Sequence, residues 1–197
     1  MNKILIAYTT NAGSTQKVAE TIAKELGLSG LQTEVRRLEE VTGLEGYSAA
    51  VIGAPMILGW HRSALKFVKR NQQTLSRMPV AYFMTAMSLT HADGENTREV
   101  PLSIDPELAK PPKNPRRLGF KERYTSTSNY LAPVLKAGPA IKPLSIGIFG
   151  GKLEIRSLKL WQMLFVLLVI RAQPGDFRNW AFIKEWAANL GHKLAPG

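Results

Sequence analysis

Residues 3–15, KILIAYTTNAGST, decide the fold class of this chain, because a short apolar run passes there into a hydroxyl-rich loop that leads straight into a helix. Lys3–Tyr8 is typical of a buried strand. The helix predicted over Ser14–Leu26 places Val18, Ile22 and Leu26 at a four-residue spacing on one face. A charge-interrupted strand over Thr33–Leu38 follows. The order predicts a βαβ unit.

Strand and helix signals keep alternating downstream of this unit. Tyr47–Gly53 is a nearly continuous apolar run, as a parallel strand buried on both faces requires. The further predictions are a helix over Ser63–Leu75, a strand over Pro79–Met84, a helix over Ser126–Lys136, a strand over Leu144–Phe149, and a last helix that runs from Asp176 as N-cap to Gly191. Five strands separated by helices predict one α/β domain over residues 1–197, with a parallel sheet covered on both faces.

The stretch 89–124, after the fourth strand, breaks this alternation. It carries five prolines, little periodicity, and a basic set made of Lys110, Lys113, Arg116, Arg117, Lys121 and Arg123. Long insertions in compact domains are usually functional or disordered. Two interpretations stay open, a solvated insertion or a contact with substrate or membrane.

The composition excludes several kinds of chemistry. The 197 residues include no Cys and only three His, which rules out thiol nucleophiles, disulfides and iron–sulfur clusters and predicts no metal site. The opening residues are typical of a strand and not of a signal peptide, so a cytoplasmic location is expected. The net charge of +11 favours anionic partners without choosing among them.

The one long apolar run, 158–170, is a second candidate for membrane contact. As a helix it would span about 20 Å, too short to cross a hydrocarbon core of roughly 30 Å alone. It is predicted either to lie in a membrane interface, as a peripheral contact, or to pack against the sheet.

The loop after the first strand is a candidate phosphate site, formed by Thr10, Asn11, Ala12, Gly13, Ser14 and Thr15. A phosphate needs convergent N–H and hydroxyl donors, and a helix N-terminus adds the favourable end of its dipole. The loop has no Lys or Arg and one Gly, so it matches neither the nucleoside-triphosphate loop nor the dinucleotide fingerprint. A Ser/Thr turn that only caps the helix is the alternative.

Three more loops should leave the same edge of the sheet, where ligands of open α/β folds bind. Their candidate residues are Pro55, Met56, Ile57, Leu58 and Gly59, then Thr85, Ala86, Met87 and Ser88, and finally Gly150, Gly151 and Lys152. An apolar loop with Met56 and Trp60 beside a phosphate loop suits a flat heteroaromatic ring. Flavin mononucleotide, FMN, fits this layout.

The motif TTNAGST resembles the phosphate signature of flavodoxins, except that Ala12 stands where many have a threonine. Residues 57–83, with GWHRSALKFVKRNQQTLSRMPVAYF, and the ending GDFRNWAFIKEWA resemble the menaquinone-dependent protoporphyrinogen dehydrogenase branch of that superfamily. The resemblance implies a flavodoxin-like fold with strand order 2-1-3-4-5. It also implies that 55–59 and 85–88 flank the ring and that the FMN phosphate is held by Thr10, Asn11, Gly13, Ser14 and Thr15.

Three functions follow as hypotheses. The favoured one, which the resemblance implies, is an FMN oxidoreductase that oxidises protoporphyrinogen IX and passes electrons to a quinone. The alternatives are a non-enzymatic basic flavodoxin-type carrier and a cofactor-free module that binds anionic lipid or nucleic acid. Nucleic acid is not an expected partner of the favoured function, and no catalytic residue is predicted. His61 is either a proton donor to reduced flavin or a surface histidine at a helix start.

Overall fold

The computed structural model describes residues 3–11, 13–56, 59–91, 101–114, 116–153 and 175–195. Its centre is a six-stranded sheet in the order β2-β1-β3-β4-β8-β6, and every pairing in it is parallel. The strands are β1 (Lys3–Tyr8), β2 (Gln32–Arg37), β3 (Tyr47–Met56), β4 (Val80–Ala86), β6 (Leu102–Ile104) and β8 (Pro143–Gly150). The predicted order 2-1-3-4-5 is therefore confirmed for the first five sheet positions.

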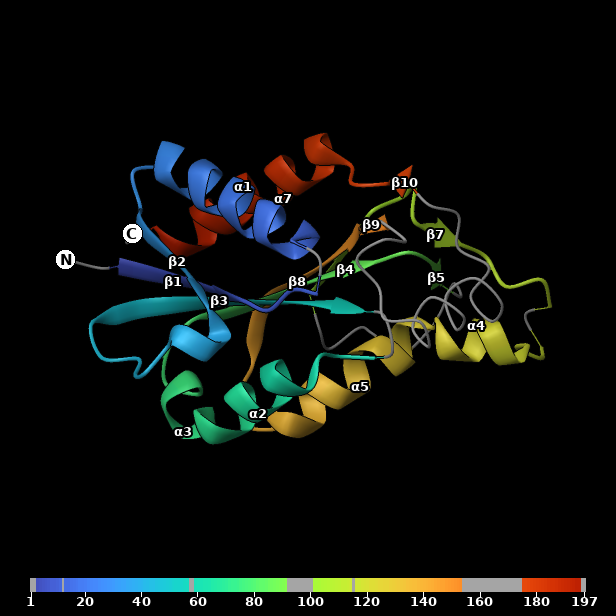
Figure 1. The fold of residues 1–197 in the computed structure, drawn as a ribbon, viewed down its shortest axis with the longest axis horizontal. Coiled ribbons are helices and arrows are strands. Elements are labelled where there is room, and N and C mark those ends of the chain that lie inside the picture. The colour runs from blue at the N-terminus through green and yellow to red at the C-terminus, as the bar shows by residue number, and fades with distance from the viewer. Residues whose placement is uncertain are drawn as a thin grey trace.

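Helices cover both faces of the sheet. Figure 1 shows α1 (Ser14–Leu28) and α7 (Trp180–Leu194) on one face, and α2 (Arg62–Arg70), α3 (Gln72–Leu75) and α5 (Thr127–Ala137) on the other. Helix α1 ends where Gly30 takes a φ of 78°, a conformation that glycine adopts without a steric penalty. The predicted helix over Ser63–Leu75 is divided at Asn71, whose side chain donates to the Phe67 carbonyl.

The core forms two layers because successive side chains of each strand point to opposite faces. In β3, Ala50, Ile52, Ala54 and Met56 face α2 and α5, whereas Ala49 and Val51 face α1 and α7. Gly53 leaves the space that the Phe83 ring fills, since a Cβ there would lie 2.0 Å from that ring. The apolar run of this strand thus correctly predicted that both of its faces are buried.

The prediction of five strands was wrong, because residues 102–104 add β6 to the sheet edge beside β8. Three residues between Pro101 and Asp105 carry no periodicity that could reveal a strand. The rest of the insertion contains β5 (Leu89–Thr90), which pairs with β7 (Ala109–Lys110), and α4 (Phe120–Tyr124). The described part of 89–124 therefore contains four short regular elements, and β6 ties it to the central sheet.

The start of the last helix was also predicted wrongly. Asp176 lies in β10 (Gly175–Asp176), which pairs with β9 (Lys152–Leu153), and the N-cap of α7 is Asn179. The Asn179 side chain accepts from the Phe182 N–H, as an Asx cap does. Either residue type can cap a helix, so the sequence alone did not separate them.

The run 158–170 lies outside the described residues. Within the part of the chain that the structure describes, no helix is both long and apolar enough to cross a membrane.

Glu34 connects the first three strands of the sheet at its β2 edge. It pairs with Lys3 of β1 and Arg36 of β2, and its carboxylate accepts from the Tyr47 hydroxyl of β3 at 2.9 Å. The Lys3 ammonium, followed by the Tyr47 hydroxyl, lowers the pKa of Glu34 from 4.5 to about 2. Stability from this carboxylate is therefore present above pH 4.5 and is lost as pH falls toward 2.

We expect Glu34→Gln to lower the free energy of unfolding by about 1 kcal/mol at pH 7, since the cluster is partly exposed. The difference from wild type should shrink at pH 3.5, where the wild-type advantage is being lost. Urea unfolding at both pH values checks this. Glu185→Gln, at an exposed position of α7, is the matched control and should change stability by less. If the difference in unfolding free energy between wild type and Glu34→Gln were larger at pH 3.5 than at pH 7, the stabilising role of the Glu34 carboxylate would be contradicted.

Candidate functional site

The candidate site lies where β1, β3, β4 and β8 end, next to the N-terminus of α1 (Figure 1). The sheet register aligns Met56 with Ala86 and Ala86 with Gly150. Tyr8, the last residue of β1, pairs with Gly53, so β3 runs on past β1. Four chain segments thus leave one rim of the sheet, as the sequence predicted.

The loop after β1 presents donors without a capping acceptor. The Gly13 N–H donates to the Thr10 hydroxyl at 2.9 Å, and Gly13 has a φ of 78°, which favours glycine. Gly13 is the N-cap of α1 and supplies no side-chain cap, and the first turn of the helix has no acidic residue. The first N–H groups of an α-helix have no partner within the helix. This N-terminus therefore suits an external anion.

A buried hydrogen bond joins this loop to the end of β4. The hydroxyl oxygens of Thr15 and Thr85 lie 3.2 Å apart, and both side chains are buried. Thr85 precedes Ala86, whose register partner is Met56. The candidate phosphate loop therefore lies beside the strand ends predicted to flank a ring.

Two residues predicted in the loop after β3 belong to the strand itself. Pro55 and Met56 are the last residues of β3 and are buried, and Gly59 follows with a φ of 85°. Trp60 returns to Met56 through an antiparallel bridge. Its indole N–H donates to the Tyr130 carbonyl at 2.8 Å, and its ring meets Tyr82 edge-on. Trp60 is thus part of the core under α5.

The segment after β4 is also partly strand. Thr85 and Ala86 are the final residues of β4, whereas Met87 and Ser88 form the half-buried connection to β5. The Tyr130 hydroxyl of α5 donates to the Ser88 carbonyl at 2.8 Å. This side of the rim is therefore fixed by a contact from the helix layer.

The fourth segment packs closely onto its neighbours. The Gly151 N–H donates to the Ala86 carbonyl at 2.8 Å, which places this segment against the end of β4. A Cβ on Gly150 would lie 1.8 Å from the Phe177 carbonyl oxygen, so only glycine fits there. Lys152 is drawn away into the pairing of β9 with β10. Gly150 and Gly151 are thus part of the rim, and Lys152 continues beyond it.

Asp105 is a rim residue that the sequence analysis missed. Its carboxylate is fully buried and accepts from the Gly150 N–H, the Glu107 N–H and the Asn179 side chain at 3.1 to 3.4 Å. It thereby ties the insertion to the end of β8 and to the start of α7. No sequence signal distinguished it from the other acidic residues of the insertion.

His61 serves as the N-cap of α2, which agrees with the structural alternative given for it. Its Nδ1 accepts from the Ser63 N–H at 3.4 Å and lies 3.4 Å from the Thr9 hydroxyl. Thr9 is buried and also donates to Glu39 at 3.4 Å. His61 therefore joins α2 to the end of β1.

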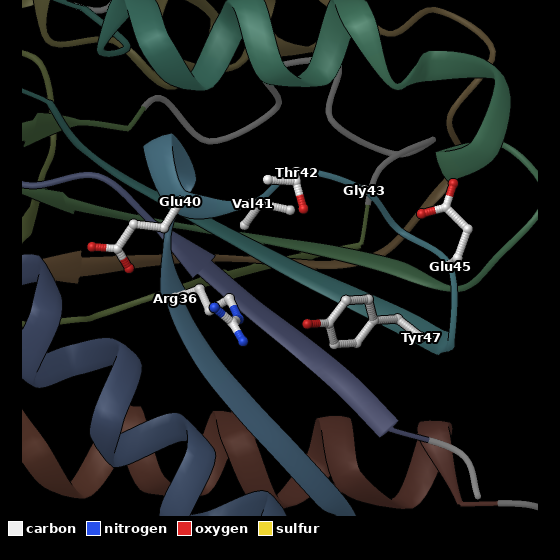
Figure 2. A pocket seen from close by; sticks show the side chains of 7 residues that line it. All are labelled: Arg36, Glu40, Val41, Thr42, Gly43, Glu45 and Tyr47. Carbon is white, nitrogen blue, oxygen red and sulfur yellow. The ribbon is translucent and has the colours of Figure 1, made fainter.

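A pocket of about 220 Å³ lies elsewhere, beside β2 and the connection to β3. Figure 2 shows its lining side chains, which come from Arg36, Glu40, Val41, Thr42, Gly43, Glu45 and Tyr47. None of the predicted site residues lines it. The pocket mixes both signs of charge and is separate from the candidate site.

The structure places most of the predicted site residues at one rim, and Thr10, Gly13, Thr15, Met56, Thr85, Ala86 and Gly151 are linked there by the contacts above. Asn11 is exposed and Ser14 is half-buried at the same helix start. Ala12, Ile57 and Leu58 lie outside the described residues. The assignment of these residues to a cofactor stays a prediction.

A parallel sheet with helices on both faces and four loops at one carboxyl rim defines a doubly wound α/β protein. A model of the flavodoxin domain family matches residues 5–178. The chain therefore belongs to the flavodoxin domain family. This membership implies flavin binding and supports oxidoreductase chemistry.

Similar proteins agree with the family. The chain is 23% identical to protoporphyrinogen IX dehydrogenase (quinone) of Escherichia coli strain K12, over 96% of this chain and 95% of that protein. It is 19% identical to the Leishmania major protein of the same name, over 95% of this chain and 74% of that one.

Solved structures show the fold alone. A short-chain flavodoxin associated with a non-canonical PDU bacterial microcompartment superposes with a TM-score of 0.50 at 10% identity, over 99% of this chain and 100% of that one. A cysteine-to-serine mutant of the Pseudomonas aeruginosa flavodoxin also gives 0.50, at 9% identity and 98% coverage of both chains.

We expect Thr15→Val to lower the free energy of unfolding of the flavin-free protein by about 1–3 kcal/mol, because the Thr85 hydroxyl would stay buried without its partner. The double variant Thr15→Val/Thr85→Val should lose less than the sum of the single variants. Urea unfolding of all four proteins measures the coupling. Thr21→Val, at a half-exposed position of α1, is the control. Strictly additive losses would show that the two hydroxyls do not interact.

Proposed function

We propose that residues 1–197 form one flavodoxin-like domain, with an insertion at about 89–124, that binds one FMN noncovalently at the rim described above. We further propose that it is an oxidoreductase that oxidises protoporphyrinogen IX and delivers the electrons to a quinone. The specific reaction is supported by the names of the Escherichia coli and Leishmania major relatives. When bound, FMN supplies the hydride and electron-transfer chemistry.

One observation carries the proposal, the bond between Thr15 and Thr85. It holds the start of α1, which we propose binds the phosphate, next to the buried ends of β3 and β4. FMN combines an anionic phosphate with an apolar ring, so its site must offer these two environments side by side. This rim offers both.

The phosphate would be held by dipoles and not by a cation. Residues 9–15 contain no Lys or Arg, and Gly13 leaves the start of α1 without a side-chain cap. Backbone N–H groups and the helix dipole stabilise a phosphate in such a place. Thr10 and Ser14 would add hydroxyls, although Thr10 already accepts from the Gly13 N–H and thereby shapes the loop.

The ring would lie near the ends of β3 and β4. Pro55, Met56, Thr85 and Ala86 are buried there, so their surroundings exclude water. Such a site protects a reduced cofactor from side reactions. Met87 and the Gly150–Gly151 backbone meet at the neighbouring part of the rim, where a Cβ on Gly151 would lie 3.4 Å from the Met87 sulfur.

The net charge of +11 also bears on the choice of function. It suits a substrate with carboxylate groups, as porphyrinogens have, because opposite charges favour encounter. A carrier for basic redox partners would be repelled by the same charge. The charge therefore disfavours a plain carrier that docks on basic partners, and a basic carrier stays as the alternative.

We expect the purified protein to be yellow and to release a pigment with the mass of FMN on denaturation. Anaerobic addition of protoporphyrinogen should bleach the band near 450 nm, and menadione should restore it. Mass spectrometry of the pigment and anaerobic absorbance spectra make the two measurements.

The outcomes separate the three hypotheses. A protein that is colourless and refuses added FMN is a cofactor-free module. Reduction of bound FMN by a reductase partner but not by protoporphyrinogen identifies an electron carrier. Either result would contradict the proposed dehydrogenase.

We expect Gly13→Ala to weaken FMN binding about tenfold, since an αL residue with a Cβ costs about 1–2 kcal/mol and the loop must shift to relieve it. Gly30→Ala is the matched control, because Gly30 has the same φ of 78° at the other end of α1. An added Cβ meets nothing within 4 Å at either position. Titration of both flavin-free variants with FMN makes the comparison. Equal affinities would contradict a phosphate site at Gly13.

A further inference from the structure

A strongly basic segment lies in the insertion, over residues 110–123. It holds six basic residues and one acidic residue, Glu122. We refer to Lys110, Lys113, Arg116, Arg117, Phe120 and Arg123 as the basic–aromatic surface. All six are exposed.

The single carboxylate of this segment is used internally. One oxygen of Glu122 accepts from the Lys113 N–H and the other from the Gly119 N–H, both at 2.7 Å. These two backbone bonds lower the pKa of Glu122, so the carboxylate is ionised at neutral pH. Glu122 thereby closes the loop 113–122 into a compact unit and concentrates the cations around it.

Two further hydrogen bonds order the chain between Lys113 and Gly119. The Asn114 side chain accepts from the Arg116 N–H at 3.0 Å, and its carbonyl accepts from the Arg117 N–H at 3.1 Å. The two arginines therefore sit on a defined turn. Their positive charges are presented by ordered backbone.

Phe120 places an apolar ring within this cationic cluster. Its side chain is 68% exposed, which is unusual for a large aromatic residue. Pro111 is exposed in the same segment, and Leu118 is half-buried. The combination of cations and an exposed aromatic ring matches the chemistry of a peripheral membrane contact.

The surface is attached directly to the candidate flavin rim. Strand β5 follows Met87 and Ser88, and it pairs with β7, which ends at Lys110. The Thr90 N–H donates to the Thr125 carbonyl at 2.8 Å, just after α4. Both ends of the basic–aromatic surface are thus anchored beside β5, and Figure 1 shows β5, β7 and α4 together at the carboxyl end of the sheet.

We propose that the basic–aromatic surface docks the protein on a bilayer that contains anionic lipid. The arginines and lysines would meet headgroup phosphates, and Phe120 would enter the boundary with the acyl chains. A single-stranded nucleic acid would need several stacking platforms along its path, and within the described part of 110–124 Phe120 is the only exposed aromatic side chain, since Tyr124 is half-buried. The composition therefore favours lipid.

The use of this docking rests on the proposed function. A quinone acceptor dissolves in the bilayer, and an anchored insertion would hold the flavin rim close to it. Docking itself needs no flavin, so the two proposals are tested separately.

The test is sedimentation of the full chain with vesicles of phosphatidylcholine alone or with 30% phosphatidylglycerol, a composition chosen to give about the charge of an anionic leaflet. Wild type should bind the anionic vesicles and not the neutral ones. Arg116→Gln/Arg117→Gln should weaken binding by about 10- to 30-fold, because each basic residue near the surface contributes roughly a three- to fivefold factor. Phe120→Ser should weaken it at least about threefold.

The matched control is Lys184→Gln/Lys193→Gln, which removes two exposed charges from α7, on the sheet face opposite α5 (Figure 1). It should bind anionic vesicles within about twofold of wild type. An equal loss in this control would overturn the proposal, because net charge alone would then explain binding. The proposal would also be overturned if Arg116→Gln/Arg117→Gln and Phe120→Ser both bound anionic vesicles as tightly as wild type does.

Competition identifies the other class of partner. If a single-stranded oligonucleotide displaces the protein from vesicles at equal phosphate concentration, the surface binds nucleic acid and the proposal is wrong. A colourless protein that still docks on anionic vesicles would refute the proposed FMN function and support this surface. A protein that oxidises protoporphyrinogen but does not bind anionic vesicles would support the proposed FMN function and overturn the docking proposal.

Discussion

Parallel pairing of β1, β3, β4 and β8 is the constraint on which the rest of the structure depends. Parallel strands must be linked by crossovers, so the helices cover both faces and the loops at the carboxyl ends collect at one rim. Register then aligns Met56, Ala86 and Gly150 across that rim. The strand order therefore fixes where the candidate site lies, and the side chains determine its detailed shape.

Two buried polar contacts fix this rim more closely than the sheet does. The Thr15–Thr85 bond joins the start of α1 to β4, and Asp105 joins the insertion to Gly150 and Asn179. Buried polar groups are costly unless they are paired, so each contact specifies one arrangement. The rim can thus stay ordered while its outer residues meet a ligand.

The insertion 89–124 combines several features in one segment. It completes the sheet with β6, supplies the buried Asp105, and presents a cationic surface beside the rim. One segment therefore combines a structural role with a charged exterior. The insertion therefore places part of the chain's positive charge beside the rim where we propose that FMN binds.

The sequence by itself determined the central strands, the helix start after TTNAGST and the basic character, because these depend on local apolar spacing and residue type. The family resemblance supplied the strand order and the expectation of FMN. The short β6, the ends of β3 and β4, and the cap at Asn179 were missed or misplaced, since local signals do not specify where a strand ends.

Only the tertiary structure decided that Trp60 belongs to the core, that Asp105 is a rim residue, and that Thr15 meets Thr85. Each depends on contacts between residues 45 to 74 positions apart in the chain. Such contacts follow from packing of the whole sheet with its helices, and no local pattern encodes them.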